Sequence, residues 1–385
     1  LESVLKAKGL SIDVESISKL TEFPMNAVIS LGGCTASFVS PKGLVVTNHH
    51  CAYGSIQYNS TTENNILENG FLAKTTGEEV SAAPGSRVFV TEQVTDVTDK
   101  VNKGTEKLTG KARFDAIQAN EKALVSECEQ DKSYRCNVYT FHGGLEYYLI
   151  KSLEIKDVRL AYAPAMGVGK YGGDIDNWMW PRHTGDFSFY RAYVGKDGKP
   201  AEYSEDNVPY QSDAFLKVSA KGVQEGDFVM VTGYPGSTNR YRISPEVDYV
   251  FNTAYPLARK YNSKYVSLIE ENAPEGSEAR IAYESTIAGY NNYIKNYGSM
   301  IESFNKGSMY SRKQQFEKDL TGWINEDSKR KAKYGHVLAD LSALVAQSQE
   351  HNQRDRMLGY VHRSQMISTA RRLYRLAYEK QKPDA

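Results

Sequence analysis

The stretch from Leu44 to Cys51 reads Leu-Val-Val-Thr-Asn-His-His-Cys. A short apolar, β-branched run ends there in two polar residues, two histidines and a cysteine. Residues 36–40 and 43–47 predict two strands joined by a tight turn at residues 41–43, Pro-Lys-Gly. A strand end is a rigid place from which a side chain can face a cleft. The stretch therefore predicts an imidazole held at the end of a hairpin.

The cysteines form two pairs that are close in sequence. Of the three connectivities that four cysteines allow, we expect the local one, in which Cys34 joins Cys51 and Cys128 joins Cys136. The first bridge would pin the residue after the second histidine to the start of the hairpin. Disulfides favour an oxidising compartment, whereas the alternative interpretation is free buried thiols in a cytosolic protein.

Composition limits the possible partners. Lys plus Arg equals Asp plus Glu at 47 each, so no net charge favours nucleic acid or an anionic membrane. Hydrophobic residues make up 40% of the 385, enough for a sizeable core. No apolar run approaches the roughly 20 residues that a membrane-spanning helix needs. We expect neither a nucleic-acid partner nor a membrane span.

Secondary-structure signals divide the chain near residue 245. Residues 1–25 predict a helical lead-in, and residues 101–129 predict a longer helix. Short strands with frequent turn signals indicate an antiparallel barrel or sandwich; they are expected at residues 87–98, 137–141, 145–149, 158–162, 187–194 and 227–231. Helices are expected from about residue 255 onward, at residues 281–306, 313–325, 337–350 and 357–379. The predicted fold class is α+β, with a strand-rich domain at residues 1–245 and a helical domain at residues 246–385.

A second motif covers residues 172–188, which read Gly-Gly-Asp-Ile-Asp-Asn-Trp-Met-Trp-Pro-Arg-His-Thr-Gly-Asp-Phe-Ser. With the Gly-Gly-Cys of residues 32–34 and the Asn-His-His-Cys of residues 48–51, it resembles the bacterial dipeptidyl peptidases of types 7 and 11. The resemblance extends to about Asn292 and continues more weakly beyond. It implies a chymotrypsin-like double β-barrel, incomplete in this chain, with an inserted and also incomplete helical cap.

The resemblance assigns roles to individual residues. His50, directly before Cys51, would be the general base, and Asp186 would orient it; a general base in acyl transfer needs an imidazole held by a buried carboxylate. Without the motif, a strand-end histidine or an Asp after Gly would have a structural role by default. His49 would point to the other side of an extended strand.

The free N-terminal amine of a substrate would meet Asn177, Trp178 and Asn292. An amide oxygen can accept from an ammonium group, and an indole face attracts a cation. Core packing is the alternative for the tryptophans, and Asn291 competes with Asn292 for the assignment. Asp174 and Asp176 could instead brace the glycine-rich loop.

A Gly-x-Ser-Gly nucleophile segment does not occur in the sequence. We read the Pro-Gly-Ser that ends at Ser237 as a turn. We therefore expect His and Asp of a triad here and the serine in a missing C-terminal segment, so that this portion alone would be inactive. The preference for a hydrophobic or acidic residue before the cut would also be decided there. The spacing of the histidines and cysteines predicts no metal site, and no cofactor is expected.

The resemblance thus implies a serine dipeptidyl peptidase that acts on oligopeptides. Because the chain opens at Leu1 without Met, we expect a processed, secreted product in the periplasm or at the cell surface. The resemblance implies a homodimer. The alternative function is a catalytically inactive peptide-binding module on the same fold, and an ordinary endopeptidase is disfavoured by the Asn177-Trp178 motif.

Overall fold

The computed structural model describes residues 2–236, 239 and 241–382. Ser237 lies outside the described residues. The chain forms two compact units, one made of Leu1–Thr238 with Lys264–Asn292 and the other of Asn239–Ser263 with Tyr293–Ala385. The first unit therefore includes a helical segment from the C-terminal half. The domain boundary near residue 245 stays a prediction.

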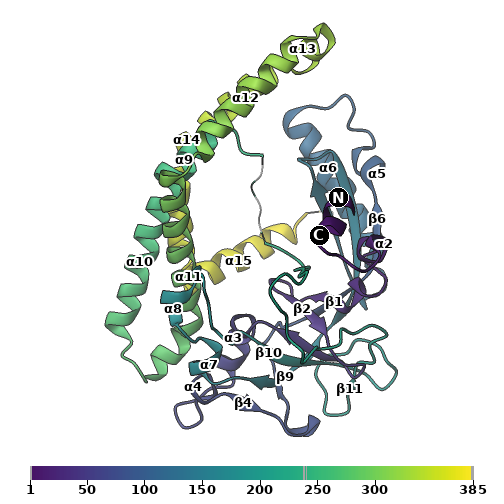
Figure 1. Ribbon diagram of the computed structural model, residues 1–385, viewed down its shortest axis with the longest axis vertical. Coiled ribbons are helices and arrows are strands. Elements are labelled where there is room, and N and C mark those ends of the chain that lie inside the picture. Colours follow the sequence, from purple (N-terminus) through teal and green to yellow (C-terminus); the bar gives the residue numbers. More distant parts are fainter. Residues whose placement is uncertain (1, 237–238, 240, 383–385) are drawn as a thin grey trace. The chain divides into compact units, whose positions relative to one another are not determined.

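The first unit is built on one antiparallel sheet (Figure 1). Its main path runs in the order β4-β9-β10-β3-β2-β1-β6-β8-β7, while β5 pairs with β9 and β11 with β10. The strands are β1 (Val28–Ser30), β2 (Thr35–Phe38), β3 (Leu44–Thr47), β4 (Phe71–Leu72), β5 (Val80–Ser81), β6 (Val88–Asp96), β7 (Tyr134–Phe141), β8 (Glu146–Ile155), β9 (Asp157–Ala163), β10 (Ser188–Val194) and β11 (Val208–Pro209).

Helices accompany the sheet and dominate the C-terminal half, which confirms an α+β fold. Up to residue 176 they are α1 (Glu2–Ala7), α2 (Val14–Ser18), α3 (His49–Tyr58), α4 (Ile66–Asn69), α5 (Thr98–Asn102), α6 (Gly110–Cys128), α7 (Met166–Gly169) and α8 (Gly173–Asp176). Those that follow are α9 (Ser244–Tyr249), α10 (Tyr255–Asn272), α11 (Glu278–Lys306), α12 (Met309–Asn325), α13 (Ser328–Tyr334), α14 (Val337–Val361) and α15 (Gln365–Glu379).

Alternation along β3 sets the direction of its side chains. Val45 and Thr47 are buried, whereas Leu44 and Val46 are only partly so. Val45 belongs to a core that includes Phe38 from β2 and Ile56 from α3, all fully buried. Burial of such side chains stabilises the fold by about 1.5–3 kcal/mol each. This core fixes the hairpin whose end carries the two histidines.

Two local predictions are wrong. The histidines do not extend a strand, because β3 ends at Thr47 and His49 begins α3. Residues 227–231 form no strand, although four of the five are apolar; the side chain of Val231 is fully exposed. A short apolar run becomes a strand only where a neighbouring strand supplies hydrogen-bond partners.

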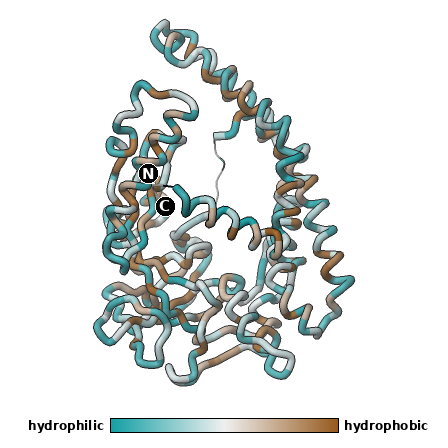
Figure 2. The backbone as a smooth tube through the Cα atoms, turned by 180° about the vertical axis from the view of Figure 1, so that it is seen from behind, coloured by the Kyte–Doolittle hydropathy of each residue, from teal (hydrophilic) through white to brown (hydrophobic). Residues whose placement is uncertain are grey.

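The second unit has a small core of its own. Val247, Val250 and Phe251 are buried, and the Phe251 ring stacks on that of Phe304 with centroids 4.4 Å apart. In Figure 2 the long helices alternate between hydrophilic and hydrophobic residues, as expected for helices that bury one face. Among the described residues, no helix is both long and apolar enough to cross a membrane.

Candidate active site

The pairing of β3 with β10 assembles the site. The two strands are antiparallel, and Thr47 at the end of β3 lies opposite Ser188 at the start of β10. In an antiparallel pair, residues that follow one strand lie beside those that precede the other. Residues 48–50 are therefore brought to Asp186, 136 positions from His50 along the chain.

His50 and Asp186 form a close pair. His50 Nδ1 lies 2.8 Å from Asp186 Oδ2, and the backbone N–H of His50 donates to Asp186 Oδ1 at 3.0 Å. A carboxylate beside Nδ1 favours the tautomer that carries its proton there, which leaves Nε2 free to accept another. The His50 side chain is 68% exposed and that of Asp186 only 17%. A reactant can thus reach the imidazole while the carboxylate stays sheltered.

Asp186 remains an anion despite its partial burial. Burial alone would raise the pKa of this carboxyl, but the hydrogen bonds from His50, the attraction of its protonated form and the positive charge of Arg182 outweigh it and lower the pKa. The Asn48 amide adds bonds to Asp186 Oδ2 at 3.2 Å and to its carbonyl oxygen at 3.3 Å. Sequence reasoning missed Asn48, although an Asn directly before a helix is a recognisable N-cap signal.

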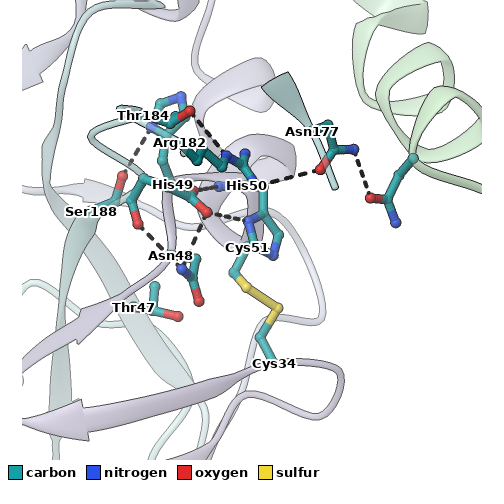
Figure 3. Close-up of polar contacts among 12 residues, drawn as sticks. Cys34, Thr47, Asn48, His49, His50, Cys51, Asn177, Arg182, Thr184 and Ser188 are labelled. Carbon is teal, nitrogen blue, oxygen red and sulfur yellow. Dashed lines mark hydrogen bonds and ion pairs between the residues drawn. A yellow bond between two sulfur atoms is a disulfide. The ribbon is translucent and has the colours of Figure 1, made fainter. Parts of the chain in front are cut away.

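A disulfide anchors the chain directly after His50 (Figure 3). Cys34 joins Cys51, the residue after His50, with Cα atoms 6.2 Å apart. The second bridge joins Cys128 at the end of α6 to Cys136 in β7. The structure thus pairs the cysteines locally, as expected from their spacing.

The two histidines diverge because both lie in the first turn of α3. Consecutive helical residues point about 100° apart. His49 is buried and His50 exposed. His49 Nδ1 lies 3.1 Å from the Ser188 hydroxyl, which is fully buried and so out of reach of a substrate.

A second polar cluster contains the three residues predicted to bind an amine. Asn292 Oδ1 accepts from Asn177 Nδ2 at 2.9 Å and from Trp178 Nε1 at 3.0 Å. Trp178 is half exposed and has a left-handed backbone with φ of 59°. A bulky residue in that conformation is strained, and such strain gathers at functional sites.

The structure also separates Asn291 from Asn292. Asn291 Nδ2 donates to Asp174 Oδ2 at 2.7 Å and thus ties α11 to α8. Arg182, which had no predicted role, donates to Thr184 Oγ1 at 3.0 Å and weakly to Asn177 Oδ1 at 3.4 Å (Figure 3). It therefore links the cluster of Asn177, Trp178 and Asn292, called the amine cluster below, to the loop that leads into Asp186.

One group in the described part of the chain has ligand atoms close enough for a metal, namely Cys34, His50 and Cys51. Both sulfurs belong to a disulfide, and metals bind the thiolate form of cysteine. The donor set therefore does not fit a metal ion.

Comparisons with known proteins agree over nearly the whole chain. The family model for Peptidase S46 matches residues 1–385. An Asp/Glu-specific dipeptidyl-peptidase of Shewanella putrefaciens is 47% identical over 383 residues, which is 99% of this chain and 52% of that protein. Dipeptidyl-peptidase 7 of Capnocytophaga gingivalis is 37% identical over 96% of this chain and 52% of its own length.

A solved structure shares the fold. The crystal structure of Porphyromonas endodontalis DPP11 in complex with the dipeptide Arg-Asp matches with a TM-score of 0.85 and 31% identity, over 92% of this chain and 52% of that one. The chain spans about half the length of the curated relatives it matches. Sequence and structure together show that the chain belongs to the peptidase S46 family.

Proposed function

We propose that the protein is a serine-type dipeptidyl peptidase that releases dipeptides from the free N-terminus of oligopeptides. The observation that carries the proposal is the contact of 2.8 Å between His50 Nδ1 and Asp186 Oδ2, with His50 exposed and Asp186 sheltered. This is the arrangement of a general base and its orienting carboxylate.

In the proposed reaction, His50 Nε2 takes the proton of a serine hydroxyl as the oxygen attacks the peptide carbonyl. The resulting imidazolium is stabilised by Asp186 and returns the proton to the leaving amine. A water molecule then hydrolyses the acyl-enzyme by the same proton transfers. Since the sequence contains no Gly-x-Ser-Gly segment, the proposal places the serine in a segment outside these 385 residues, and this portion alone would be inactive.

In this proposal, the amine cluster gives the enzyme its preference for the free N-terminus of a peptide substrate. Both hydrogen bonds that Asn292 Oδ1 accepts come from Asn177 and Trp178, so the three side chains form one unit. Within the described part of the chain, Asn177 Oδ1 has only the weak contact with Arg182, at 3.4 Å, and can accept from a substrate ammonium group. An anchored amine fixes how far along the peptide the scissile bond lies, which restricts products to dipeptides.

The proposal also covers the cellular compartment and the oligomeric state of the enzyme. Two disulfides are typical of an oxidising compartment, which supports secretion to the periplasm or cell surface. We also propose a homodimer.

The test compares a dipeptide reporter with its N-acetylated form, using the gene product that contains these residues. Acetylation removes the positive charge and two of the donors, so we expect kcat/KM to fall by about 10²-fold, consistent with the loss of a charged hydrogen bond. Initial rates at several substrate concentrations measure this ratio.

The variant Asn292→Ala provides the control. It should lower turnover of the free-amine reporter while leaving the acetylated one unchanged, because only the former uses the cluster. Equal rates on both reporters with the wild type would reject amine recognition. Binding of peptides without any turnover would indicate a peptide-binding module instead.

A further inference from the structure

The first histidine of the pair, His49, has no part in the proposed reaction, yet it lies between the elements that build the site. Its ring is buried at 1% exposure and meets the Tyr53 ring edge-on, with centroids 5.7 Å apart. On one side, Nδ1 contacts the hydroxyl of Ser188, two residues after Asp186. Figure 3 shows His49 directed toward Ser188.

On its other side, the His49 ring packs on the backbone of α7. A Cβ atom added to Gly169 would lie 2.7 Å from Cδ2 and Cγ of the imidazole and 2.8 Å from Nε2. Real Cβ atoms do not approach other atoms so closely, so residue 169 has to be glycine for the ring to occupy this place. The imidazole therefore fills the space between α7 and β10.

The helix α7 in turn contacts the approach to Asp186. The N–H of Gly185 donates to the Val168 carbonyl at 3.0 Å, and a Cβ on Gly185 would lie 2.7 Å from Val168 Cγ1. His49 therefore contacts α7 on one side and Ser188 on the other, and α7 contacts Gly185. Asp186 lies in the chain between Gly185 and Ser188. Displacement of the ring would shift the backbone on both sides of Asp186.

The same helix leads into the amine cluster. The chain passes from Gly169 to the loop of Asn177 and Trp178, and the Thr184 hydroxyl donates to the Tyr171 carbonyl at 2.7 Å within this connection. His49 therefore lies next to the common origin of both parts of the site.

Simple core filling does not account for this residue. His49 Nε2 is buried and has no hydrogen-bond partner among the described residues. An apolar ring would occupy the space without leaving a polar atom unsatisfied, since burying an unpartnered polar atom is unfavourable. The Nδ1 contact with Ser188 is what an apolar ring could not supply.

We propose that His49 is a positioning residue, whose buried imidazole joins β10 to α7 and so places Asp186 against His50. It acts through Asp186 and touches no substrate. The ring works in its neutral form: burial lowers the pKa of His49, and although Asp186 opposes this, the positive charge of Lys170 and the protonated form of His50 act in the same direction as burial. The neighbouring Tyr53 hydroxyl is neutral, because burial raises its pKa.

Two glycines of α7 provide a matched test. Gly169→Ala pushes a Cβ into the His49 ring, whereas Gly167→Ala adds the same atom where nothing lies within 4 Å. Both substitutions replace Gly by Ala in the same short helix. The first readout is the low-field NMR signal of the His50 Nδ1 proton in the gene product that contains this chain, which reports the hydrogen bond to Asp186 without any catalysis. We expect Gly169→Ala to shift or abolish this signal and Gly167→Ala to preserve it.

The second readout is the kinetics of the gene product that contains the chain, and it rests on the proposed function. Misplacement of a catalytic group by about 1 Å can cost about 10²-fold, so kcat should fall by that order in Gly169→Ala while KM changes by less than roughly twofold. If the wild type shows no turnover, this result counts against the proposed function but not against the role of His49. The NMR signal still tests that role.

An unchanged His50 signal and kcat in Gly169→Ala would overturn the proposal, as would equal losses in both glycine variants. Should Gly169→Ala fail to fold, Ser188→Ala removes the hydroxyl contact without adding bulk. It should weaken the His50 Nδ1 signal in a folded protein, and a wild-type signal there would also overturn the proposal.

Discussion

Replacement of Asp186 by Asn is expected to lower kcat by about 10⁴-fold with little change in substrate binding. The carboxamide nearly preserves the size of the side chain, but it removes the negative charge of the carboxylate whose Oδ2 lies 2.8 Å from His50 Nδ1. It also offers a donor where His50 needs an acceptor, which favours the wrong tautomer of the imidazole. Steady-state kinetics on a free-amine dipeptide reporter measure the effect.

The control for this variant is Asp115→Asn on α6. Asp115 forms an exposed ion pair with Lys111 one helical turn away, a kind of contact that contributes little to stability. Its loss should leave kcat unchanged. A kcat for Asp186→Asn within tenfold of the wild type would exclude His50 and Asp186 as the general base and its partner.

The same substitution has a consequence for acid stability. The folded-state pKa of Asp186 is lowered, chiefly because the hydrogen bonds from His50 outweigh burial. The contribution of Asp186 to the free energy of unfolding is therefore present above the unfolded-state pKa of about 3.9. It is lost as pH falls through the lower folded-state value. In strong acid the wild type should lose this part of its stability, whereas the stability of Asp186→Asn should not change for this reason, because Asn does not titrate.

Removal of the Cys34–Cys51 bridge is expected to cost about 3 kcal/mol of unfolding free energy, from the chain entropy that a loop of this size regains when unfolded. The variant Cys34→Ala/Cys51→Ala should also lose activity beyond this destabilisation, because Cys51 follows His50 directly in the first turn of α3. Denaturant unfolding and kinetics at a temperature where the variant stays folded separate the two effects.

The other bridge is the matched comparison. Cys128→Ala/Cys136→Ala opens a shorter loop, with a sequence separation of 8 against 17, and its predicted cost is slightly smaller. It joins α6 to β7 and contacts neither His50 nor Asp186. Equal activity losses in the two double variants would show that the first bridge stabilises the fold without positioning the histidine.

The sequence predicts most strands and helices near the site but not how they meet. Apolar runs bounded by turn residues locate β3 and β10, yet their register, which pairs Thr47 with Ser188, depends on contacts 141 positions apart. The proximity of His50 to Asp186 could therefore come only from the resemblance. Likewise, periodicity places Asn292 on a helix but does not bring it to Asn177.

Local signals were also misread where tertiary contacts decide. Asn48 before the histidines marks the helix start that the strand prediction overlooked. Its amide then bonds Asp186 instead of capping α3, a use that no local pattern reveals. Residues 227–231 do form an apolar run, but none of the described strands pairs with it.

The central claim is that His50 and Asp186 activate a serine that these 385 residues do not contain. Fluorophosphonate labelling of the gene product, with the labelled peptide located by mass spectrometry, tests it most directly. We predict a label on a serine outside this sequence, and loss of that label in Asp186→Asn. A label on a serine within these residues, or labelling that is indifferent to Asp186, would contradict the account.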